Sequence, residues 1–491
     1  YDYSNKCVVR ACFANHQGMS LMGLTNYLKN AVIKDYFYQN TGIKAYDVLL
    51  KEKADITMKV AEYKKSNYKK EVIKDDIRKI DDISIMPEVS VLSNKKYTLF
   101  MNDRGDNFTR YCTLQLNRYR TITKQDYGIF FYIKDLDTKK IWSNTYAPIN
   151  QKPDKYEVLF SSDKIKYFRR DGVISTKTEV IVLQNHHAEI RKLTFYNDSD
   201  DTKLLQVTSY TEPILCENID DVSHRVFQNL FLSSNYDDKT HSLIMRRKGG
   251  MSNINAYMIQ SFLIDDAKDE YTYETDRFNF IGRNRAYQNP QALSKNLSCN
   301  VGDSIDPVMS LRNTIEIAPN SSKTIYFISG FGRSRDQLLD IVKSYDTKEK
   351  MDEAFKVTSL VNIMNTKMLK VVDSEIRNYN MMLNYLYQTT TIVVGEDRKQ
   401  LLRQNILSQH GLQKFGISGD RPIILVNINS INGITFVFEI LKAFEYFKSK
   451  SVFVDVIVIN SECPENSKII EDKIKDELYR MYAINGFSNT P

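Results

Sequence analysis

The fold of this chain is indicated most clearly by residues 189–210, which read EIRKLTFY, NDSDDTK and LLQVTSY in succession. The two outer segments are rich in β-branched and aromatic residues, which favour extended strands. The cluster from Asn197 to Asp201 between them is typical of a tight turn. We therefore expect a β-hairpin here.

The same pattern continues outward from this stretch. Short apolar runs separated by Asn, Asp, Gly and Ser recur between Val89 and Gly330, without a helical pattern among them. Many consecutive strands without intervening helices predict a large antiparallel β-sandwich, which we place at residues 85–332. The strands expected most clearly are 97–101, 128–133, 173–183, 189–196, 204–210 and 324–328.

Helical spacing returns on the C-terminal side of the sandwich. Apolar residues recur at helical intervals over residues 336–345 and 350–386, which contain no Pro or Gly, and predict a helical linker at 333–390. A further helix is expected at 398–407. The runs 422–428, 434–448 and 452–459 then predict, locally, a β-α-β succession.

The N-terminal side differs in composition. Apolar residues between Cys7 and Leu28 have helical spacing that Gly18 interrupts, so we expect two short helices around a glycine turn. Residues 51–84 are rich in Lys, Glu and Asp and predict a solvated, charged linker. The chain starts at Tyr1 without methionine, and we expect it to be a piece of a longer protein.

Composition excludes several classes of protein. The 491 residues suggest about three domains, and no apolar run reaches the ~20 residues that span a bilayer. The 68 basic and 61 acidic residues are intermixed, so nucleic-acid binding is not indicated. The six cysteines form neither a zinc motif nor a disulfide framework, which favours a reducing compartment. His186 and His187 lack a third ligand at metal spacing, and we expect no metal site.

Three stretches carry side chains suited to sugar hydroxyls. His16 and Gln17 combine donors and acceptors at a helix start, where a helix N-terminus with a satisfied His is the alternative. Arg104, Asp106 and Arg110 belong to a loop, residues 101–111, that also carries aromatic residues. Its alternative is a hairpin loop whose Asp and Arg pair with each other. Trp142, the one tryptophan, is expected in the core.

The third stretch is glycine-rich, residues 411–420, GLQKFGISGD. Its glycines allow a close backbone approach, Ser418 and Asp420 bring oxygen acceptors, and Lys414 brings a positive charge, as in a loop that lines a ligand. It is neither a P-loop nor a dinucleotide fingerprint. A structural turn remains the alternative reading.

The order of eight stretches resembles the glycoside hydrolase family 94 enzymes, specifically cyclic β-1,2-glucan synthases and β-1,2-oligoglucan phosphorylases. These stretches are HQGMS (16–20), MNDRGDNFTRY (101–111), YGIFFYIKDLDTKKIWSNTYAP (127–148), FRRDGVISTKTEVIV (168–182), YETDRFNFIGRNR (273–285), SLRNTIEIAP (310–319), FGISGDRPI (415–423) and FEYF (444–447). The chain departs from the family pattern at Asn15, Gln413 and Arg421, which implies an altered sugar contact.

The resemblance implies a multidomain α+β fold: a tail of a glycoamylase-like α/α domain at 1–50, the phosphorylase-type β-sandwich, the helical linker, and at 391–491 the incomplete start of an (α/α)6 catalytic barrel. It implies that Asp420 and Ser418 bind the donor sugar, supported by Gln409 and Lys414. Arg104, Asp106 and Arg110 would reach acceptor sugars. No Asp-Trp-Asn-Asp stretch occurs, so we expect no catalytic residue in this chain.

The function implied is that of a carbohydrate-active enzyme that makes or processes β-1,2-glucan by glycosyl transfer or inverting phosphorolysis. Inorganic phosphate or glucose 1-phosphate would be the co-substrate, and no cofactor is expected. Partners would be a β-linked glucan, the remaining domains of the parent chain and a second copy through the sandwich. The location would be cytoplasmic, including the cytoplasmic side of a membrane-anchored parent. The alternative is a non-catalytic carbohydrate-binding or dimerisation module.

Overall fold

The computed structural model describes residues 14–39, 78–83, 87–120, 127–249, 255–265, 267, 270–387, 400–401, 403–462 and 464–485. The chain divides into two units, residues 1–72 and 73–491. In the first unit, α1 (Ala14–Leu28) is followed by α2 (Val32–Tyr38). α1 continues through Gly18, so the predicted glycine turn is wrong. A glycine costs a helix only about 1 kcal/mol relative to alanine and does not by itself end it.

Two expectations on the N-terminal side fall largely outside the described residues. These are the first of the two short helices, before residue 14, and most of the charged linker.

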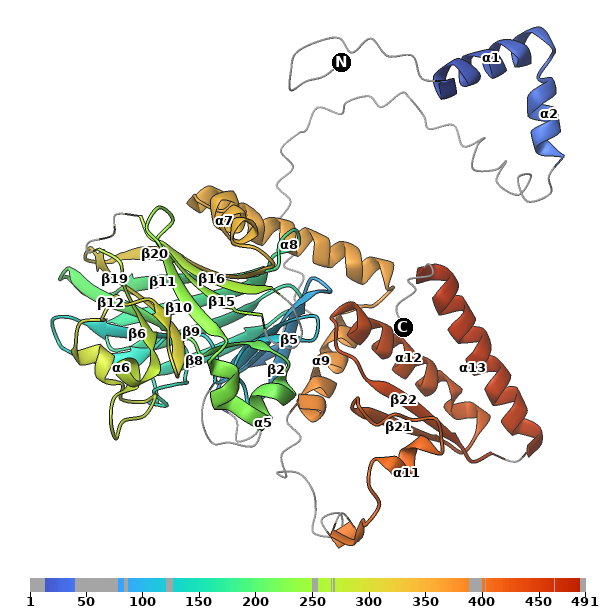
Figure 1. Cartoon of the computed structure of the whole chain (residues 1–491). Coiled ribbons are helices and arrows are strands. Elements are labelled where there is room, and N and C mark those ends of the chain that lie inside the picture. The colour runs from blue at the N-terminus through green and yellow to red at the C-terminus, as the bar shows by residue number, and fades with distance from the viewer. Residues whose placement is uncertain are drawn as a thin grey trace. The chain divides into compact units, whose positions relative to one another are not determined.

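The second unit is built around a sandwich of antiparallel strands, as predicted (Figure 1). In the described residues its largest sheet has ten strands, in the order β1 (Arg78–Ile80), β8 (Lys155–Phe160), β9 (Ile165–Asp171), β10 (Ile174–Val182), β11 (Ala188–Asn197), β20 (Ser321–Gly332), β16 (Ala256–Leu263), β15 (Ser242–Arg247), β14 (Leu232–Asp237) and β18 (Gly302–Asp303).

Two five-stranded sheets complete the sandwich. One has the order β17 (Thr272–Asp276), β19 (Pro307–Ile317), β12 (Lys203–Tyr210), β6 (Phe130–Asp135) and β7 (Ile141–Ser143). The other has the order β13 (Pro213–Cys216), β5 (Leu114–Asn117), β4 (Asn107–Tyr111), β3 (Tyr97–Asn102) and β2 (Val89–Ser93).

The turn at residues 197–201 exists, but the hairpin predicted around it is wrong. β11 pairs with β10 and β20 in the large sheet, whereas β12 pairs with β6 and β19 in another sheet. Asn197 closes the turn, since its amide donates to the Asp201 carbonyl at 2.7 Å and its Oδ1 accepts from the Ser199 amide at 3.1 Å. The strands separate because each has an apolar face that enters the core from an opposite sheet.

The sandwich core is apolar and continuous. Phe131, Phe262 and Phe327 meet there edge to face, and Trp142 is 4% exposed, which confirms its predicted place in the core. Along β10 the residues alternate between buried and half-buried positions from Ile174 to Glu179, which is the period-two pattern of a strand with one face on the core.

Helices cover the other face of the large sheet and continue the chain. α7 (Arg335–Ser344) and α8 (Lys348–Met368) lie along that sheet, and Leu338, Ile341 and Met351 pack on it (Figure 1). α9 (Asp373–Tyr387) follows after a break at 369–372. The helical linker is therefore observed. Inserted between strands are α5 (Asn218–Asn229), α6 (Arg277–Ile281) and the 3-10 helix η1 (Gln291–Ser294).

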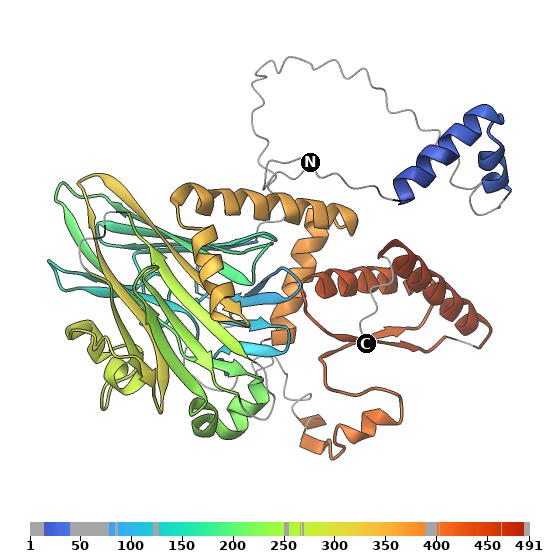
Figure 2. The same cartoon turned by 45° about the horizontal axis from the view of Figure 1, so that its top comes forward.

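The C-terminal residues form an α/β unit. α11 (His410–Gln413) precedes β21 (Ile423–Ile428), η2 (Ile431–Gly433), α12 (Ile434–Ser449), β22 (Asp455–Asn460) and α13 (Pro464–Asn485). β21 and β22 are parallel, which confirms the local β-α-β prediction. Figure 2 shows both long helices on one side of these strands.

This arrangement differs from the start of an (α/α)6 barrel, which the resemblance implies for residues 391–491. The described part of that range pairs strands rather than helices. The physical reason is local, because Ile423–Ile428 and Asp455–Asn460 are rich in β-branched residues and pair through their backbones, while Val437 and Leu441 of the intervening helix cover one face of the pair. Of the predicted helix 398–407, residues 400–401 and 403–404 are helical and residues 405–407 are not, while residues 398–399 and 402 lie outside the described residues.

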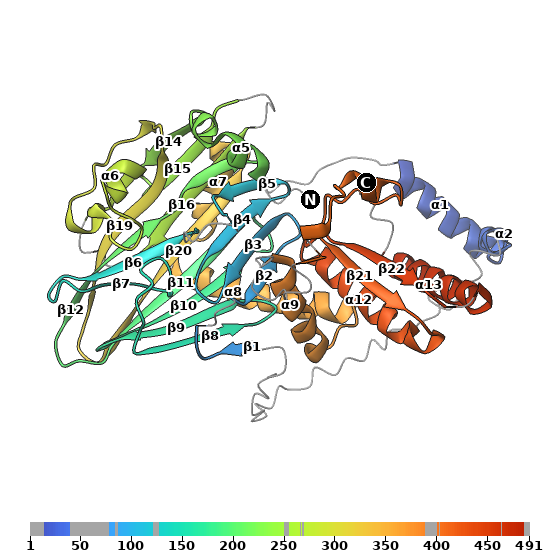
Figure 3. The ribbon, with the colours of Figure 1, turned by 90° about the horizontal axis from the view of Figure 1, so that it is seen from below.

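The sheet β2–β5 joins the sandwich to this C-terminal unit. Figure 3 shows β2 beside α9, and an apolar cluster spans the junction. Phe100 of β3, Tyr379 of α9 and Phe447 of α12 belong to that cluster. The junction is therefore a packed core rather than a flexible linker.

Candidate functional site

The glycine-rich loop after α11 folds back on Gln409. The Gln409 amide donates to the Ser418 carbonyl at 2.8 Å and to Asp420 Oδ1 at 2.9 Å, and the Asp420 backbone N–H donates to Ser418 Oγ at 3.3 Å. Gly419 has φ +74°, and a Cβ there would lie 2.8 Å from Gln409 Cγ. Three predicted sugar ligands are thus brought together, while Lys414 is exposed and takes no part in these hydrogen bonds.

Phe453 lies between Arg421, at the end of this loop, and Arg110 of the sandwich. The residue is 48% exposed, and the guanidinium carbons of Arg421 and Arg110 lie 5.4 and 5.8 Å from its ring centroid. Arg421 directly follows Asp420, and Arg110 belongs to β4. An aromatic face beside carboxylate, amide and hydroxyl groups is the combination that recognises a sugar ring. Sequence reasoning missed Phe453.

Arg110 also holds this junction together. Its guanidinium donates to the Ser451 carbonyl and lies 5.1 Å from the Phe100 ring centroid. Burial lowers the pKa of Arg110. The structure thus places Arg110 beside the loop, with its guanidinium bound within the chain.

The other two predicted residues of the 101–111 stretch are in a tight turn. The stretch is a β3–β4 hairpin rather than a long loop. Asp106 accepts from the Asn102 amide at 3.0 Å and from the Tyr127 backbone N–H at 3.2 Å. The guanidinium of Arg104 lies 5.8 Å from the Tyr146 ring centroid. The Asp106 carboxylate therefore helps to fix the turn.

His16 and Gln17 lie in the first helical turns of α1 and are exposed. The His16 N–H donates to Asn15 Oδ1 at 3.0 Å. Both residues belong to the first unit, residues 1–72, whereas the other predicted site residues belong to the second.

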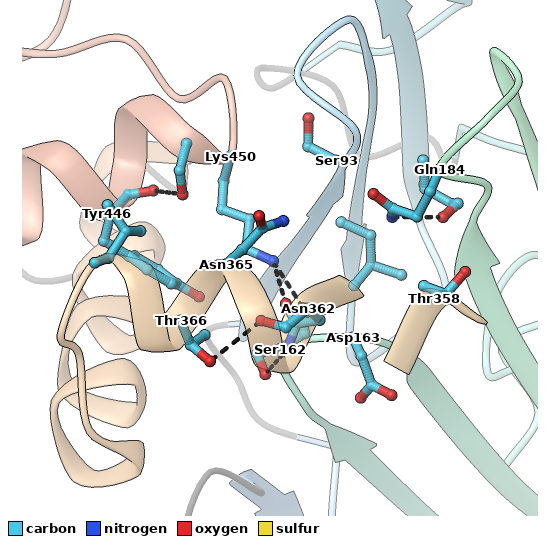
Figure 4. Close-up of a pocket in the computed structure, with 14 residues that line it drawn as sticks. Ser93, Ser162, Asp163, Gln184, Thr358, Asn362, Asn365, Thr366, Tyr446 and Lys450 are labelled. Carbon is cyan, nitrogen blue, oxygen red and sulfur yellow. Dashed lines mark hydrogen bonds between the residues drawn. The ribbon is translucent and has the colours of Figure 1, made fainter. Parts of the chain in front are cut away.

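A polar cavity of about 20 Å³, room for about one water molecule, lies in the seam between α8, α12 and the sandwich (Figure 4). Lys450 Nζ donates to the Ser162 carbonyl at 2.8 Å and to Asn362 Oδ1 at 3.0 Å. The Asn362 amide donates to Ser162 Oγ at 2.7 Å. The cavity is too small for a sugar, and its hydrogen bonds hold the C-terminal unit on the sandwich.

A buried charge network lies at the other side of the sheet β2–β5, near α5 and α6. Its centre is Glu212, which is 3% exposed and accepts hydrogen bonds from five donors. These are Arg118, Arg225, Arg277, Tyr210 and Tyr287. Asp221 of α5 accepts from Arg118 Nη2 at 2.9 Å and also from Arg120.

The network is structural rather than reactive. Burial by itself would raise the pKa of Glu212, but Arg118, Arg277 and Arg225 lower it to about 2. Glu212 is therefore ionised at neutral pH and cannot act as a general acid. Sequence reasoning missed it because its partners lie 94 positions upstream and 65 downstream. The sequence feature that could have indicated a buried carboxylate is the apolar run Pro213-Ile214-Leu215 directly after Glu212.

The described residues offer neither a metal cluster nor a membrane-spanning helix. No three His, Cys, Asp or Glu side chains there gather as they would around a metal ion. Among the described helices, none has the length and apolar character needed to cross a membrane.

The fold defines a class: a large antiparallel sandwich covered on one face by helices. Residues 78–348, more than half of the chain, match the family model described as glycosyl hydrolase 94, supersandwich domain. The chain belongs to this family, which confirms the resemblance stated above.

Two curated relatives extend the comparison. The cyclic beta-(1,2)-glucan synthase NdvB of Rhizobium meliloti is 25% identical over 501 aligned positions, which cover 99% of this chain and 18% of the relative. A 3-O-beta-D-glucopyranosyl-beta-D-glucuronide phosphorylase of Paenibacillus borealis is 23% identical over 215 positions, 43% of this chain and 26% of the relative. The chain thus spans about a quarter or less of each relative.

Proposed function

We propose that this chain is part of a carbohydrate-active enzyme that makes or processes β-1,2-glucan by glycosyl transfer or inverting phosphorolysis. The observation that supports this best is the cluster of Gln409, Ser418 and Asp420, together with Arg421, which directly follows Asp420 and lies over the half-exposed Phe453 ring. Family membership and the printed activities of both relatives agree with it.

Within this proposal, the chain supplies sugar-binding residues and not the general acid. In an inverting phosphorolysis a carboxylic acid protonates the glycosidic oxygen while phosphate attacks the opposite face of the sugar. Phosphate is already anionic and needs cationic or N–H partners rather than a base. No Asp-Trp-Asn-Asp stretch occurs in the sequence, and the buried Glu212 is ionised. The proposed acid therefore belongs to another segment of the parent enzyme.

The test is turnover by the parent enzyme carrying Asp420→Ala. Loss of a charged hydrogen-bond acceptor for a sugar hydroxyl, about 1.5–3 kcal/mol, should raise KM for linear β-1,2-glucan by ten-fold or more in phosphate-dependent release of glucose 1-phosphate. Asp472→Ala, which removes an exposed carboxylate from α13, is the matched control. Equal KM values in the two variants would reject the assignment of Asp420.

A second candidate function, a dimerisation module, is favoured by α5. Five apolar side chains of α5 and its C-cap are 53–64% exposed: Ile219, Val222, Val226, Phe227 and Leu230. Exposed apolar stripes of this kind mark interfaces. If the sandwich pairs through α5, Val226→Glu should convert a dimer to a monomer in analytical ultracentrifugation. A monomeric wild-type chain would reject this candidate.

The cytoplasmic location and the phosphate co-substrate stay predictions.

A further inference from the structure

A groove of about 580 Å³ opens at the edge of the sandwich, where the two main sheets diverge. One wall comes from β7 and the turn before it, with Lys140, Ile141 and Trp142. The opposite wall comes from the β9–β10 hairpin, with Asp171 and Val173. The loop between β7 and β8 closes one end with Gln151, Lys152 and Asp154. The volume is in the range of small-molecule sites.

A buried arginine organises two of these walls. Arg169 has a side chain with 0% exposure, and it donates to both carboxylate oxygens of Asp171 at 2.7 and 2.9 Å. Its guanidinium also donates to the Thr145 carbonyl at 2.8 Å and to the Gln151 carbonyl at 3.2 Å. The β7–β8 loop is therefore bound to the hairpin by a buried, charge-assisted contact, which fixes the groove before any ligand arrives.

Asp154 is oriented by the same hairpin. Its Oδ2 accepts from the Gly172 backbone N–H at 2.6 Å, and its own N–H donates to the Arg170 carbonyl at 2.9 Å. Lys152, two residues before it, is exposed. A carboxylate and an ammonium group thus stand together at the rim, one of them held in place by backbone contacts.

The side chains that line the groove favour a neutral ligand. Three carboxylates and three ammonium groups line the groove, so their formal charges cancel: Asp135, Asp154, Asp171, Lys140, Lys152 and Lys203. A neutral polyhydroxylated molecule suits such a wall better than an ion, because its hydroxyls satisfy donors and acceptors at once. Val173, 42% exposed, adds an apolar surface for sugar C–H groups.

We propose that this groove is a second glucan-binding site, which holds a neutral β-linked gluco-oligosaccharide away from the Asp420 loop. The proposal rests on the proposed function for its choice of sugar. Trp142 lines the groove and is the one tryptophan of the chain. Its indole N–H has no hydrogen-bond partner among the described residues. Because the chain has no other tryptophan, an emission change on adding a ligand to the folded protein reports on the surroundings of Trp142.

The experiment is a titration of the chain with a β-1,2-linked gluco-oligosaccharide, read by Trp142 emission and by calorimetry. Saturable emission change and heat are expected for the wild type. Lys152→Ala and Asp154→Ala should each weaken binding by about ten-fold, since each loses a charge-assisted hydrogen bond. Asp303→Ala, an exposed carboxylate on β18, is the control and should bind as the wild type. Glucose 1-phosphate tests the preference for a neutral ligand.

The outcomes separate this proposal from the proposed function. The Lys152 side chain holds no backbone contact among the described residues, so Lys152→Ala should fold normally. Unchanged affinity of this variant for the oligosaccharide would overturn the proposal that the groove binds it. Tighter binding of glucose 1-phosphate than of the oligosaccharide would also overturn the proposal. Wild-type chain that shows neither emission change nor heat would also overturn it, while turnover by the parent enzyme would still support the proposed function. Asp420→Ala should keep the Trp142 response, and its loss would assign the binding to the loop instead.

Discussion

Removal of the charge at Glu212 should destabilise the sandwich strongly. The substitution Glu212→Gln keeps the size of the side chain but leaves Arg118, whose side chain is 1% exposed, with Asp221 as its remaining carboxylate partner. Breaking a buried ion pair from one side costs about 3–5 kcal/mol, because a desolvated charge loses its counter-charge.

The pKa of Glu212 gives a second route to the magnitude. It falls from the model-peptide value of 4.5 to about 2. At 1.36 kcal/mol per pKa unit, a lowering of this size corresponds to roughly 3 kcal/mol. A carboxyl group whose folded pKa is depressed contributes stability above its unfolded pKa and loses it as the pH falls toward the folded pKa. The two routes agree on about 3–4 kcal/mol at neutral pH.

The assay is urea unfolding of the wild type and Glu212→Gln, followed by Trp142 fluorescence and circular dichroism. At pH 7 we expect the free energy of unfolding to fall by about 3–4 kcal/mol. The gap between the two proteins should narrow between about pH 4.5 and pH 2. Asp306→Asn, a network carboxylate with a side chain 33% exposed, is the control and should cost about 1 kcal/mol or less. A gap under about 1 kcal/mol at pH 7, or one that widens in acid, would refute the reasoning.

Two further substitutions test the turn and the seam. Gly105→Ala should lower the free energy of unfolding by about 2–4 kcal/mol, since φ is +100° and the new Cβ would lie 2.5 Å from Thr145 Cβ. The control is Gly172→Ala, where φ is +64° and the space around the new Cβ is open. It should lower the free energy of unfolding by only about 1–2 kcal/mol in the same denaturation assay. Lys450→Met should lower the free energy of unfolding by about 1–3 kcal/mol and increase hydrogen exchange in α12, because the Ser162 carbonyl and Asn362 Oδ1 lose their donor. Lys448→Met is the control and should leave hydrogen exchange unchanged.

Local patterns predicted the strands well and their partners less well. Runs of β-branched and aromatic residues between turn clusters placed β10, β11 and β12 within about two residues of their observed ends. The turn between β11 and β12 was correct, but a cluster such as Asn197–Asp201 specifies only a reversal of the chain. Which sheet each strand joins depends on pairing with β20 and β19, more than 100 residues away.

The candidate site shows the same limit. The glycine-rich loop placed Ser418 and Asp420 together because they are neighbours in the sequence, and the resemblance added Gln409, whose side-chain amide binds both residues in the structure. The place of the Phe453 ring could not be predicted, because the two arginines beside it, Arg110 and Arg421, are 311 positions apart in the sequence. Arg110 was singled out as a ligand from its chemistry. In the structure its guanidinium binds the Ser451 carbonyl, a contact across 341 positions.

The contact between Arg110 and the Ser451 carbonyl indicates a positioning role for the sandwich. Arg110, Ser93 and Lys450 all act at the seam beside the loop and bind the backbone or side chains of the facing unit. Phe453 follows Ser451 by two residues, so the position of its ring depends on how firmly the seam holds that segment. Sugar binding demands placement to within a fraction of an ångström, because a misplacement of about 1 Å costs up to 100-fold in rate. If Asp420 and Phe453 bind a sugar as proposed, we expect the sandwich to contribute by fixing the Phe453 ring, and Arg110 to control affinity without touching the ligand.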